Sequence, residues 1–397
     1  MQKLKIKLED NPFFSSPEIT TLTNYFGFAA ASLTYFEFNE YRHLFSKHSD
    51  VTYINMLLGY EQKITATTDL FKFIDSDSIN NLRTGRTVLI FDATLEGYSE
   101  TDIPLKTCLS YNAALYNIDP SKIFLFTGNF LTADDSINVI PIFLLDTGWN
   151  NILDPTDINT AQTECFKNLE KIILSLSRRN RFSRVVAHFA LWKSQLSQDS
   201  IISQDALSDI STLPADILKK LNLTVEDWQQ FKNALPLLAD GNNFHINAPF
   251  DHLPELHSKT VFSIVNETLI SNYNNTSLFF SEKLLKPIIN YQPMIIYGQP
   301  GINRSIQILG FKTYEQYFDL AFDDEPDDII RYKKLLASVE NTAVYLRSLS
   351  RDKQIEWRFK ELDLLTYNRA VFVRKENTMK QLGIFSKKLT SIFQTKS

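Results

Sequence analysis

The sequence predicts an α/β protein with two domains, each built around a mainly parallel β-sheet. The chain has 397 residues, whereas a single domain usually holds roughly 100 to 200. Apolar runs of four to eight residues alternate with helical stretches in both halves, a pattern typical of parallel strands buried on both faces. The apolar fraction of 44% and the charged fraction of 22% are those of a folded globular protein. We therefore expect two Rossmann-like domains followed by a C-terminal helical segment.

The first half contains three apolar runs that predict buried strands, at Thr87–Phe91, Lys122–Phe126 and Asn138–Leu145. Turn-forming residues follow the first two runs, at 92–97 and 127–129. Ligands of open α/β sheets bind at the carboxyl ends of strands, so these loops are candidate sites. The same Gly, Asn and Asp residues also form ordinary strand-exit turns, and that alternative stays open.

A polar stretch at residues 147–170 separates the two halves, and a new apolar run begins at Lys171–Leu176. A region at 194–240, rich in acids and amides, is predicted to be helical and leads to a strand at Thr260–Val265. Thr224 within that region is expected to be the N-cap of a helix, because acidic residues follow it in the next turn. The predicted domains are 1–165, 166–345 and 346–397, the last being helices that pack back on the body.

Composition and charge restrict the functional class. The net charge of -5 argues against a surface built for nucleic acid, which usually carries a basic excess. Cys108 and Cys165 are too few for a disulfide framework, and a reducing compartment is expected. The first residues lack the apolar core of a signal peptide, and no run approaches the ~20 apolar residues of a membrane span. We therefore expect a cytoplasmic protein.

The basic, amphipathic stretch at 375–397 is expected to form a packed terminal helix. Contact with a membrane surface is the alternative for this stretch, although stable anchoring usually needs a second signal.

The densest basic cluster lies between the apolar run Lys171–Leu176 and a helical stretch at Val185–Trp192. A strand that runs into a helix start presents free backbone N–H groups and a positive dipole end, which together bind phosphate. Arginine adds planar forks that hold phosphate oxygens in pairs. A solvated basic turn is the alternative. The predicted phosphate-binding residues in this cluster are Arg178, Arg179, Arg181 and Arg184.

A second cationic segment starts a predicted helix in the middle of the second half. Glu282 suits the positive end of the helix, whereas Lys283 and Lys286 do not, so the two lysines are expected to bind an anion such as a nucleotide diphosphate. The Glu282 carboxylate can accept hydrogen bonds from two ribose hydroxyls. The alternative is an exposed helix start with an ion pair between Glu282 and Lys286.

This second segment resembles the donor-binding segment of GT-B glycosyltransferases. The resemblance rests on Ser281–Lys283, on Lys286–Ile288 and on the Pro-containing apolar run Gln292–Gly298. It is similar to the corresponding stretch of fucosyltransferases, and closer to uncharacterised glycosyltransferase-like proteins of bacteria and phages. In those proteins an Arg-rich strand exit comes earlier, a strand ending in Glu-Thr precedes the helix, and a Leu-Gly-Phe-Lys-Thr stretch follows. Val265–Thr268 and Leu309–Thr313 supply the last two elements.

The resemblance covers about residues 174–328 and implies a GT-B architecture. The acceptor would then bind mainly to residues 1–165 and the nucleotide-sugar donor to residues 166–345. Ser177 and Ser183 depart from the Asn and His that the resemblance leads us to expect around the arginines. The resemblance also implies that Glu267, Thr268 and Ser281 belong to the donor site. It implies no bound metal and no cofactor, since the nucleotide-sugar is a substrate.

The sequence therefore predicts a metal-independent hexosyl- or pentosyltransferase of polysaccharide biosynthesis, which moves a sugar from a nucleotide-sugar donor to a hydroxyl of a glycan or glycolipid. If transfer inverts the sugar, a base must deprotonate the acceptor hydroxyl. Glu96 is the first candidate and Asp92 the second, because both follow a strand of the first half. Asp75 and Asp77 are a weaker candidate metal pair, since they lie in a polar loop.

Three histidines and two acidic residues match the residue types of a metal-ligand set, but their mixed spacing favours surface or capping roles. These residues are His245, Asp251, His252, Glu255 and His257. Two other functions stay open. One is a transferase acting on hydroxylated bases of phage DNA, against which the acidic balance argues weakly. The other is a nucleotide- or glycan-binding module without catalysis, which would keep the cationic segments and lack a base.

Overall fold

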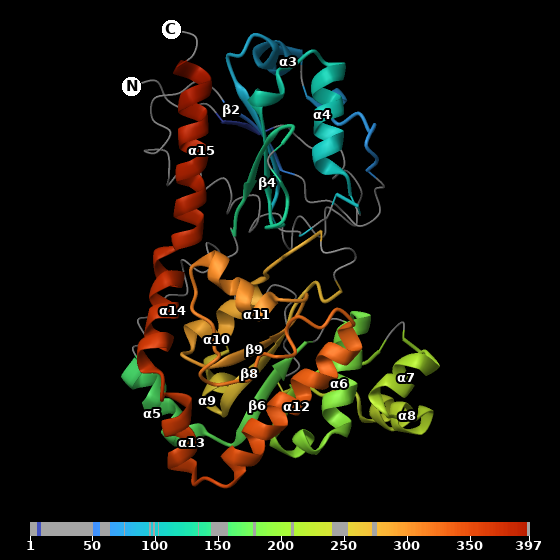
Figure 1. Cartoon of the computed structure of the whole chain (residues 1–397), viewed down its shortest axis with the longest axis vertical. Coiled ribbons are helices and arrows are strands. Elements are labelled where there is room, and N and C mark those ends of the chain that lie inside the picture. Colours follow the sequence, from blue (N-terminus) through green and yellow to red (C-terminus); the bar gives the residue numbers. More distant parts are fainter. Residues whose placement is uncertain are drawn as a thin grey trace. The chain divides into compact units, whose positions relative to one another are not determined.

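The chain divides into two compact units in the computed structural model (Figure 1). Unit 1 comprises Met1–Asn151, Tyr273–Phe280 and Lys375–Ser397, and unit 2 comprises Ile152–Asn272 and Ser281–Arg374. Both units are therefore built from segments that are discontinuous in sequence. The structure describes residues 6–8, 51–55, 64–74, 76–94, 97, 100–101, 103–133, 135–143, 158–177, 180–207, 210–239, 253–271 and 276–394.

Unit 1 is built on a parallel sheet of five described strands in the order β1-β2-β3-β4-β5. Alternate side chains of the central strands pack on opposite faces, as a parallel sheet covered on both sides requires. Leu89 and Leu125 face α4 (Leu105–Leu115), whereas Ile90 and Phe124 face α15 (Glu376–Gln394). Figure 1 shows these two helices on opposite sides of the sheet. The strands are Ile6–Leu8, Val51–Asn55, Val88–Ala93, Ile123–Thr127 and Asn138–Pro141.

The short segment Tyr273–Phe280 belongs to unit 1 although unit 2 surrounds it in sequence. Asn129 fixes it, because its amide donates to the Thr276 carbonyl at 2.9 Å and accepts from the Leu278 N–H at 3.0 Å. Gly97 allows the close approach of this segment, since a Cβ at that position would lie 2.3 Å from the Cβ of Phe279.

Unit 2 is built on a parallel sheet of four described strands in the order β7-β6-β8-β9. Every residue of β8 is buried, as a strand covered on both faces should be. On one face, α6 (Phe182–Lys193) packs with α7, α8 and α12 around Val185, Phe189 and Trp228. Figure 1 shows α12 crossing beside α6, with α7 and α8 farther out. The strands are Lys171–Leu176 (β6), Ser200–Ser203 (β7), Thr260–Asn266 (β8) and Met294–Tyr297 (β9).

The helices begin where the sequence supplies capping side chains. Thr224 forms a capping box with Asp227 at the start of α8, which confirms the predicted N-cap. Asp327 caps α12 by accepting from the N–H groups of Ile329 and Ile330. Within the described residues, the remaining α-helices are Ser76–Arg83 (α3), Ile158–Asn168 (α5), Ala215–Leu221 (α7), Val225–Ala234 (α8), Pro254–Ser258 (α9), Leu285–Ile289 (α10), Ile302–Ser305 (α11), Asp328–Arg347 (α12), Arg351–Arg358 (α13) and Leu362–Arg374 (α14).

The α/β class, the parallel sheets and the C-terminal helices agree with the sequence prediction, and three details differ. Strand β7 lies inside the region predicted to be wholly helical. Strand β3 continues through Asp92 to Ala93, because ladder hydrogen bonds join backbone atoms whatever the side chain. Strand β5 ends at Pro141, although the Ile142 N–H still donates to the Thr127 carbonyl of β4 at 2.9 Å. Within the described residues, none of the helices is long and apolar enough to cross a membrane.

Candidate functional site

Three segments of unit 2 converge at the carboxyl ends of β6 and β8. They are the connection from β6 to α6, the residues that follow β8, and the turn at Glu282–Leu284 (η10), a 3-10 helix that leads directly into α10. Ser281 caps this turn, and its hydroxyl accepts from the Lys283 N–H. The carboxyl edge of a parallel sheet is where such folds bind ligands, so the polar side chains on these segments form the candidate site.

Glu267 connects two of the three segments. Its carboxylate accepts from the N–H of Thr268 at 3.0 Å and from the N–H of Ser281 at 3.3 Å. Its own N–H donates to the Tyr297 carbonyl at 2.8 Å, which extends the ladder between β8 and β9. The side chain is fully buried, and its carboxylate is satisfied by backbone N–H groups of both segments. Glu267 therefore holds these two segments of the site together. Its predicted place in the donor site stays a prediction.

Arg181 and Arg184 connect α6 to the residues after β8. Arg184 is buried, and its guanidinium donates to the Glu267 carbonyl at 2.8 Å and to the Thr268 hydroxyl at 3.0 Å. Arg181 is the N-cap of α6, and its guanidinium donates to the Thr268 carbonyl at 3.1 Å. The two arginines therefore lie against the same short segment.

Lys283 brings the second predicted cationic segment to the same place. Its ammonium donates to the Glu282 carboxylate at 2.8 Å, to the Thr268 hydroxyl at 3.0 Å and to the Ser281 hydroxyl at 3.2 Å. Thr268 is thus in contact with both Arg184 and Lys283. The structure joins the two cationic clusters that are about a hundred residues apart in sequence.

The ion pair between Glu282 and Lys283 controls the charge of this site. Burial raises the pKa of a carboxyl, but the Lys283 ammonium outweighs it and lowers the pKa of Glu282 to about 2, with a smaller contribution from Lys286. Burial and the nearby Arg184 charge lower the pKa of Lys283, while Glu282 and Glu267 oppose this change. The alternative drawn from the sequence, a pair between Glu282 and Lys286, is wrong in its partner, because the Lys283 ammonium is the one in contact.

A buried polar network lies on the α6 face of the sheet beneath this site. The His188 ring lies 3.1 Å from Gln204 Oε1 through Nδ1, and 3.0 Å from the Ser175 hydroxyl through Nε2. These partners assign the proton to Nδ1. The Asn266 amide donates to the Ser175 hydroxyl at 2.9 Å. Burial lowers the pKa of His188 to about 4, so the ring is neutral at pH 7.

This network sets the orientation of Asn266 at the end of β8. Its amide nitrogen faces Ser175 and His188, and its amide oxygen has no hydrogen-bond partner among the described residues. The hydroxyl of Ser177, just beyond the neighbouring strand end, is also buried and unpartnered within the described part of the chain. The N–H of Phe182 likewise meets no acceptor there, as expected for the first turn of α6.

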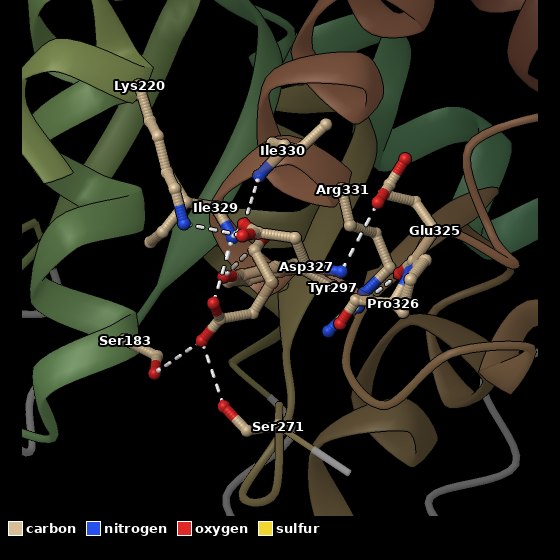
Figure 2. Close-up of polar contacts among 11 residues, drawn as sticks. Ser183, Lys220, Ser271, Tyr297, Glu325, Pro326, Asp327, Ile329, Ile330 and Arg331 are labelled. Atoms are coloured by element: carbon tan, nitrogen blue, oxygen red, sulfur yellow. Dashed lines mark hydrogen bonds and ion pairs between the residues drawn. The ribbon is translucent and has the colours of Figure 1, made fainter. Parts of the chain in front are cut away.

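A carboxylate at the start of α12 holds the surrounding segments together. Asp328 accepts from the Ser271 hydroxyl at 2.9 Å and from the Ser183 hydroxyl at 3.4 Å. Figure 2 shows both serine hydroxyls directed at one carboxylate. The Tyr297 hydroxyl donates to the Asp328 carbonyl at 3.1 Å. Asp328 therefore links α6, β9 and the segment after β8.

Arg331 completes this support one turn further along α12. Its guanidinium donates to the carbonyls of Gly298 at 3.1 Å and Ile270 at 2.7 Å. It also donates to the carbonyls of Glu325 at 2.5 Å and Pro326 at 3.3 Å (Figure 2). The side chain is fully buried. A buried arginine bound to four carbonyls fixes the loops after β8 and β9 in one arrangement.

The remaining predicted site residues are placed as follows. Arg178, Arg179 and Glu96 lie outside the described residues. Asp92 lies within β3, one residue before its end, instead of in the exit loop as expected. Lys286 lies in α10, where its charge acts on Glu282.

The candidate metal ligands do not form a site within the described residues. No group of three or more His, Cys, Asp and Glu side chains there could hold a metal ion. His257 is buried instead, with Nδ1 at 2.6 Å from Gln292 Oε1. Asp77 lies in α3. Asp75, His245, Asp251 and His252 fall outside the described part of the chain.

Sequence reasoning missed His188, Asn266 and Asp328. Asn266 directly follows the apolar run at Thr260–Val265, so its place at a strand end was available as a signal. Asp328 was recognisable as a helix-start acid, but its serine partners come from distant segments. His188 sits in an apolar helical run, where a satisfied core histidine is the common outcome.

No family model and no curated protein matches the chain. Among solved structures, it is similar to a trehalose-6-phosphate synthase, OtsA, with 11% identity over 85% of this chain and 72% of that chain and a TM-score of 0.38. A UDP-forming trehalose-phosphate synthase from Burkholderia xenovorans gives 10% identity over 86% and 74% and a TM-score of 0.39. The wall teichoic acid polymerase TagF gives 11% identity over 90% and 85% and a TM-score of 0.25.

A likeness to fucosyltransferases is not shown. At these TM-scores the similarity assigns neither an activity nor residue roles to this chain. The function is therefore inferred from the chemistry of the site.

Proposed function

We propose that this chain is a glycosyltransferase that binds the phosphates of a nucleotide-sugar donor at the carboxyl edge of the sheet in unit 2. The observation that carries the proposal is the contact of both Arg184 and Lys283 with Thr268. Two cations that share one neutral hydroxyl create a local positive potential directly beside a ligand-binding edge.

The balance of charge favours an anionic ligand. Among the described residues of the site, Arg181, Arg184 and Lys283 supply three cations, whereas Glu267 and Glu282 supply two carboxylates. Lys283 pairs with Glu282, and both arginines donate to backbone carbonyls, so cations are in excess. The first turn of α6 adds the positive end of a helix dipole at the same edge. A diphosphate presents several acceptor oxygens and matches this arrangement.

In transfer, negative charge develops on the leaving diphosphate as the bond to the sugar breaks. Preorganised cations and hydrogen-bond donors stabilise that charge, and this is usually the largest single contribution to the rate. Cationic side chains can neutralise the diphosphate in the place of a divalent ion. Glu282 is proposed to bind the ribose hydroxyls of the donor.

The acceptor would be a hydroxyl of a glycan or glycolipid, deprotonated by a carboxylate of unit 1. Glu96 and Asp92 remain the candidates for this base. Asp92 lies next to the carboxyl end of β3, the kind of position from which α/β proteins present chemical groups.

Calorimetric titration with nucleoside diphosphates, the matching nucleosides and inorganic pyrophosphate tests the proposal. We expect the diphosphates to bind and to raise the melting temperature by mass action, while nucleosides bind far more weakly. Lys283→Met should weaken diphosphate binding, and Lys353→Met, at an exposed ion pair on α13, is the matched control. Absence of diphosphate binding by the wild-type protein would reject the proposal.

A further inference from the structure

The Lys283 ammonium has no proton left for a ligand as it is placed. An ammonium carries three donors and no acceptor. All three have protein partners, namely the Glu282 carboxylate at 2.8 Å, the Thr268 hydroxyl at 3.0 Å and the Ser281 hydroxyl at 3.2 Å. A direct contact with phosphate would require Lys283 to give up one of these bonds.

The Thr268 hydroxyl is in the opposite situation. A hydroxyl oxygen accepts at two lone pairs and donates one proton. Both lone pairs of Thr268 are engaged, by Arg184 Nη2 at 3.0 Å and by Lys283 Nζ at 3.0 Å. No atom of the described residues accepts the Thr268 hydroxyl proton. That proton is therefore directed away from both cations and remains available to an acceptor.

The Ser281 hydroxyl repeats this arrangement on the other side of Lys283. Its oxygen accepts from the Lys283 N–H at 3.4 Å and from the Lys283 ammonium at 3.2 Å. Its proton also has no acceptor within the described residues, although the side chain is almost fully buried. An unused donor in such a place is costly unless something accepts it.

We propose that the hydroxyls of Thr268 and Ser281, and not the Lys283 ammonium, donate hydrogen bonds to the oxygens of the bound phosphate. Arg184 and Lys283 act through these hydroxyls, because they hold the two oxygens and leave only the protons to face the ligand. The inference rests on the proposed function, and it assigns the phosphate contact to two neutral groups.

Electrostatics strengthens these two donors. A hydroxyl whose oxygen is bound to a cation has a more positive proton, since hydrogen bonds in a chain polarise one another. Bonds from such donors to an ionised oxygen are short and strong. With both lone pairs occupied, the hydroxyls cannot accept, so the site selects ligand atoms that only accept. A phosphate oxygen meets that requirement, whereas an amine or a cation does not.

Matched variants of Thr268 test the inference, with pyrophosphate and a nucleoside diphosphate as probes. Thr268→Val keeps the shape and removes the hydroxyl, and Thr268→Ser keeps the hydroxyl. Loss of one charge-assisted hydrogen bond should lower the affinity of Thr268→Val for either probe by about tenfold or more. The affinity of Thr268→Ser should stay within about threefold of wild type. Ser281→Ala should also lose affinity for both probes.

A double-mutant cycle separates a direct from an indirect role of Lys283. If Lys283 acts through the hydroxyls, Lys283→Met should weaken binding strongly in the wild type and only about threefold or less in a Thr268→Val, Ser281→Ala background. Equal losses in both backgrounds would show that the ammonium itself contacts phosphate and would overturn the inference.

Melting temperatures of each variant keep a folding defect apart from a binding defect. Thr268→Val removes an acceptor of two cations, so some loss of stability is expected. Titrations are therefore made well below each melting temperature. Wild-type affinity in folded Thr268→Val would reject the inference and leave the proposed function intact. If the wild-type protein binds pyrophosphate but no nucleoside diphosphate, the proposed function fails and the hydroxyl contacts stand.

Discussion

The carboxylate of Asp328 lies 2.9 Å from the Ser271 hydroxyl, and this contact joins the first turn of α12 to the residues that follow β8. Asp328→Asn removes the charge and keeps the shape. We expect it to lower the free energy of unfolding by about 1 to 2 kcal/mol, because hydrogen bonds to a charged acceptor are worth more than neutral ones. Urea denaturation measures the change.

Asp363→Asn is the matched control for this variant. Asp363 also lies in the first turn of a helix, α14, but its side chain is exposed. Its effect should stay within a few tenths of a kcal/mol, the scale of an exposed helix-dipole contact. Equal effects of the two substitutions would contradict the positioning role of Asp328.

His188 should make stability depend on pH. Its pKa is lowered from 6.5 to about 4, so between these values the unfolded chain binds a proton that the folded protein does not. The free energy of unfolding should therefore fall as pH decreases through this window, by up to about 3 kcal/mol. Denaturation at pH 7.5 and pH 4.5 measures it. In His188→Gln, which cannot titrate, this component of the pH dependence should be missing.

Glu282 should contribute to stability at neutral pH. The folded pKa of about 2 lies below the ordinary value of 4.5, so the stabilisation is complete above pH 4.5 and is lost as pH falls toward 2. Glu282→Gln should lower the free energy of unfolding at pH 7 by at most about 3 kcal/mol. The wild type and the variant should converge near pH 2, and a difference that is constant with pH would argue against the ion pair.

Glu282 should also discriminate between ligands. If its carboxylate binds the ribose, Glu282→Gln should lower the affinity for a nucleoside diphosphate by about tenfold and leave the affinity for pyrophosphate nearly unchanged. Equal losses for the two ligands would instead indicate that the substitution acts through Lys283. Calorimetric titration of the same protein preparation decides between these outcomes.

Sugar transfer should survive chelation. The positive charge proposed to stabilise the leaving group comes from side chains, so EDTA should leave the rate of transfer or donor hydrolysis within about twofold. A complete loss that a divalent ion restores would contradict this prediction and return attention to Asp75 and Asp77.

Local patterns predicted the strands of unit 2 well. The bounds of β6 agree with the sequence prediction, and β8 differs by one residue, because uninterrupted apolar runs specify strands buried on both faces. Strand β7 was missed because Ser200–Ser203 has no long apolar run, and its pairing with β6 supplies the order that its sequence lacks. Tertiary pairing overrides local propensity in such edge strands.

The site was predictable in its parts and not in their connection. Arg184 and Lys283 were recognisable as cations near helix starts. Their meeting at Thr268 depends on β6 and β8 being neighbours in the sheet, and strand order is not encoded in any single segment. The full burial of Glu267 has the same origin, since its partners are backbone groups on two separate segments.

On the ribosome, synthesis of unit 1 begins before that of unit 2, yet unit 1 can be completed only after unit 2. The apolar face of the unit 1 sheet that contains Ile90 and Phe124 is covered by Leu382, Phe385 and Leu389 of α15. All of unit 2 emerges between Asn151 and Lys375, before that helix exists. The apolar face of the unit 1 sheet therefore stays uncovered during synthesis of unit 2, and chaperones bind surfaces of this kind. Docking of α15 then covers that face.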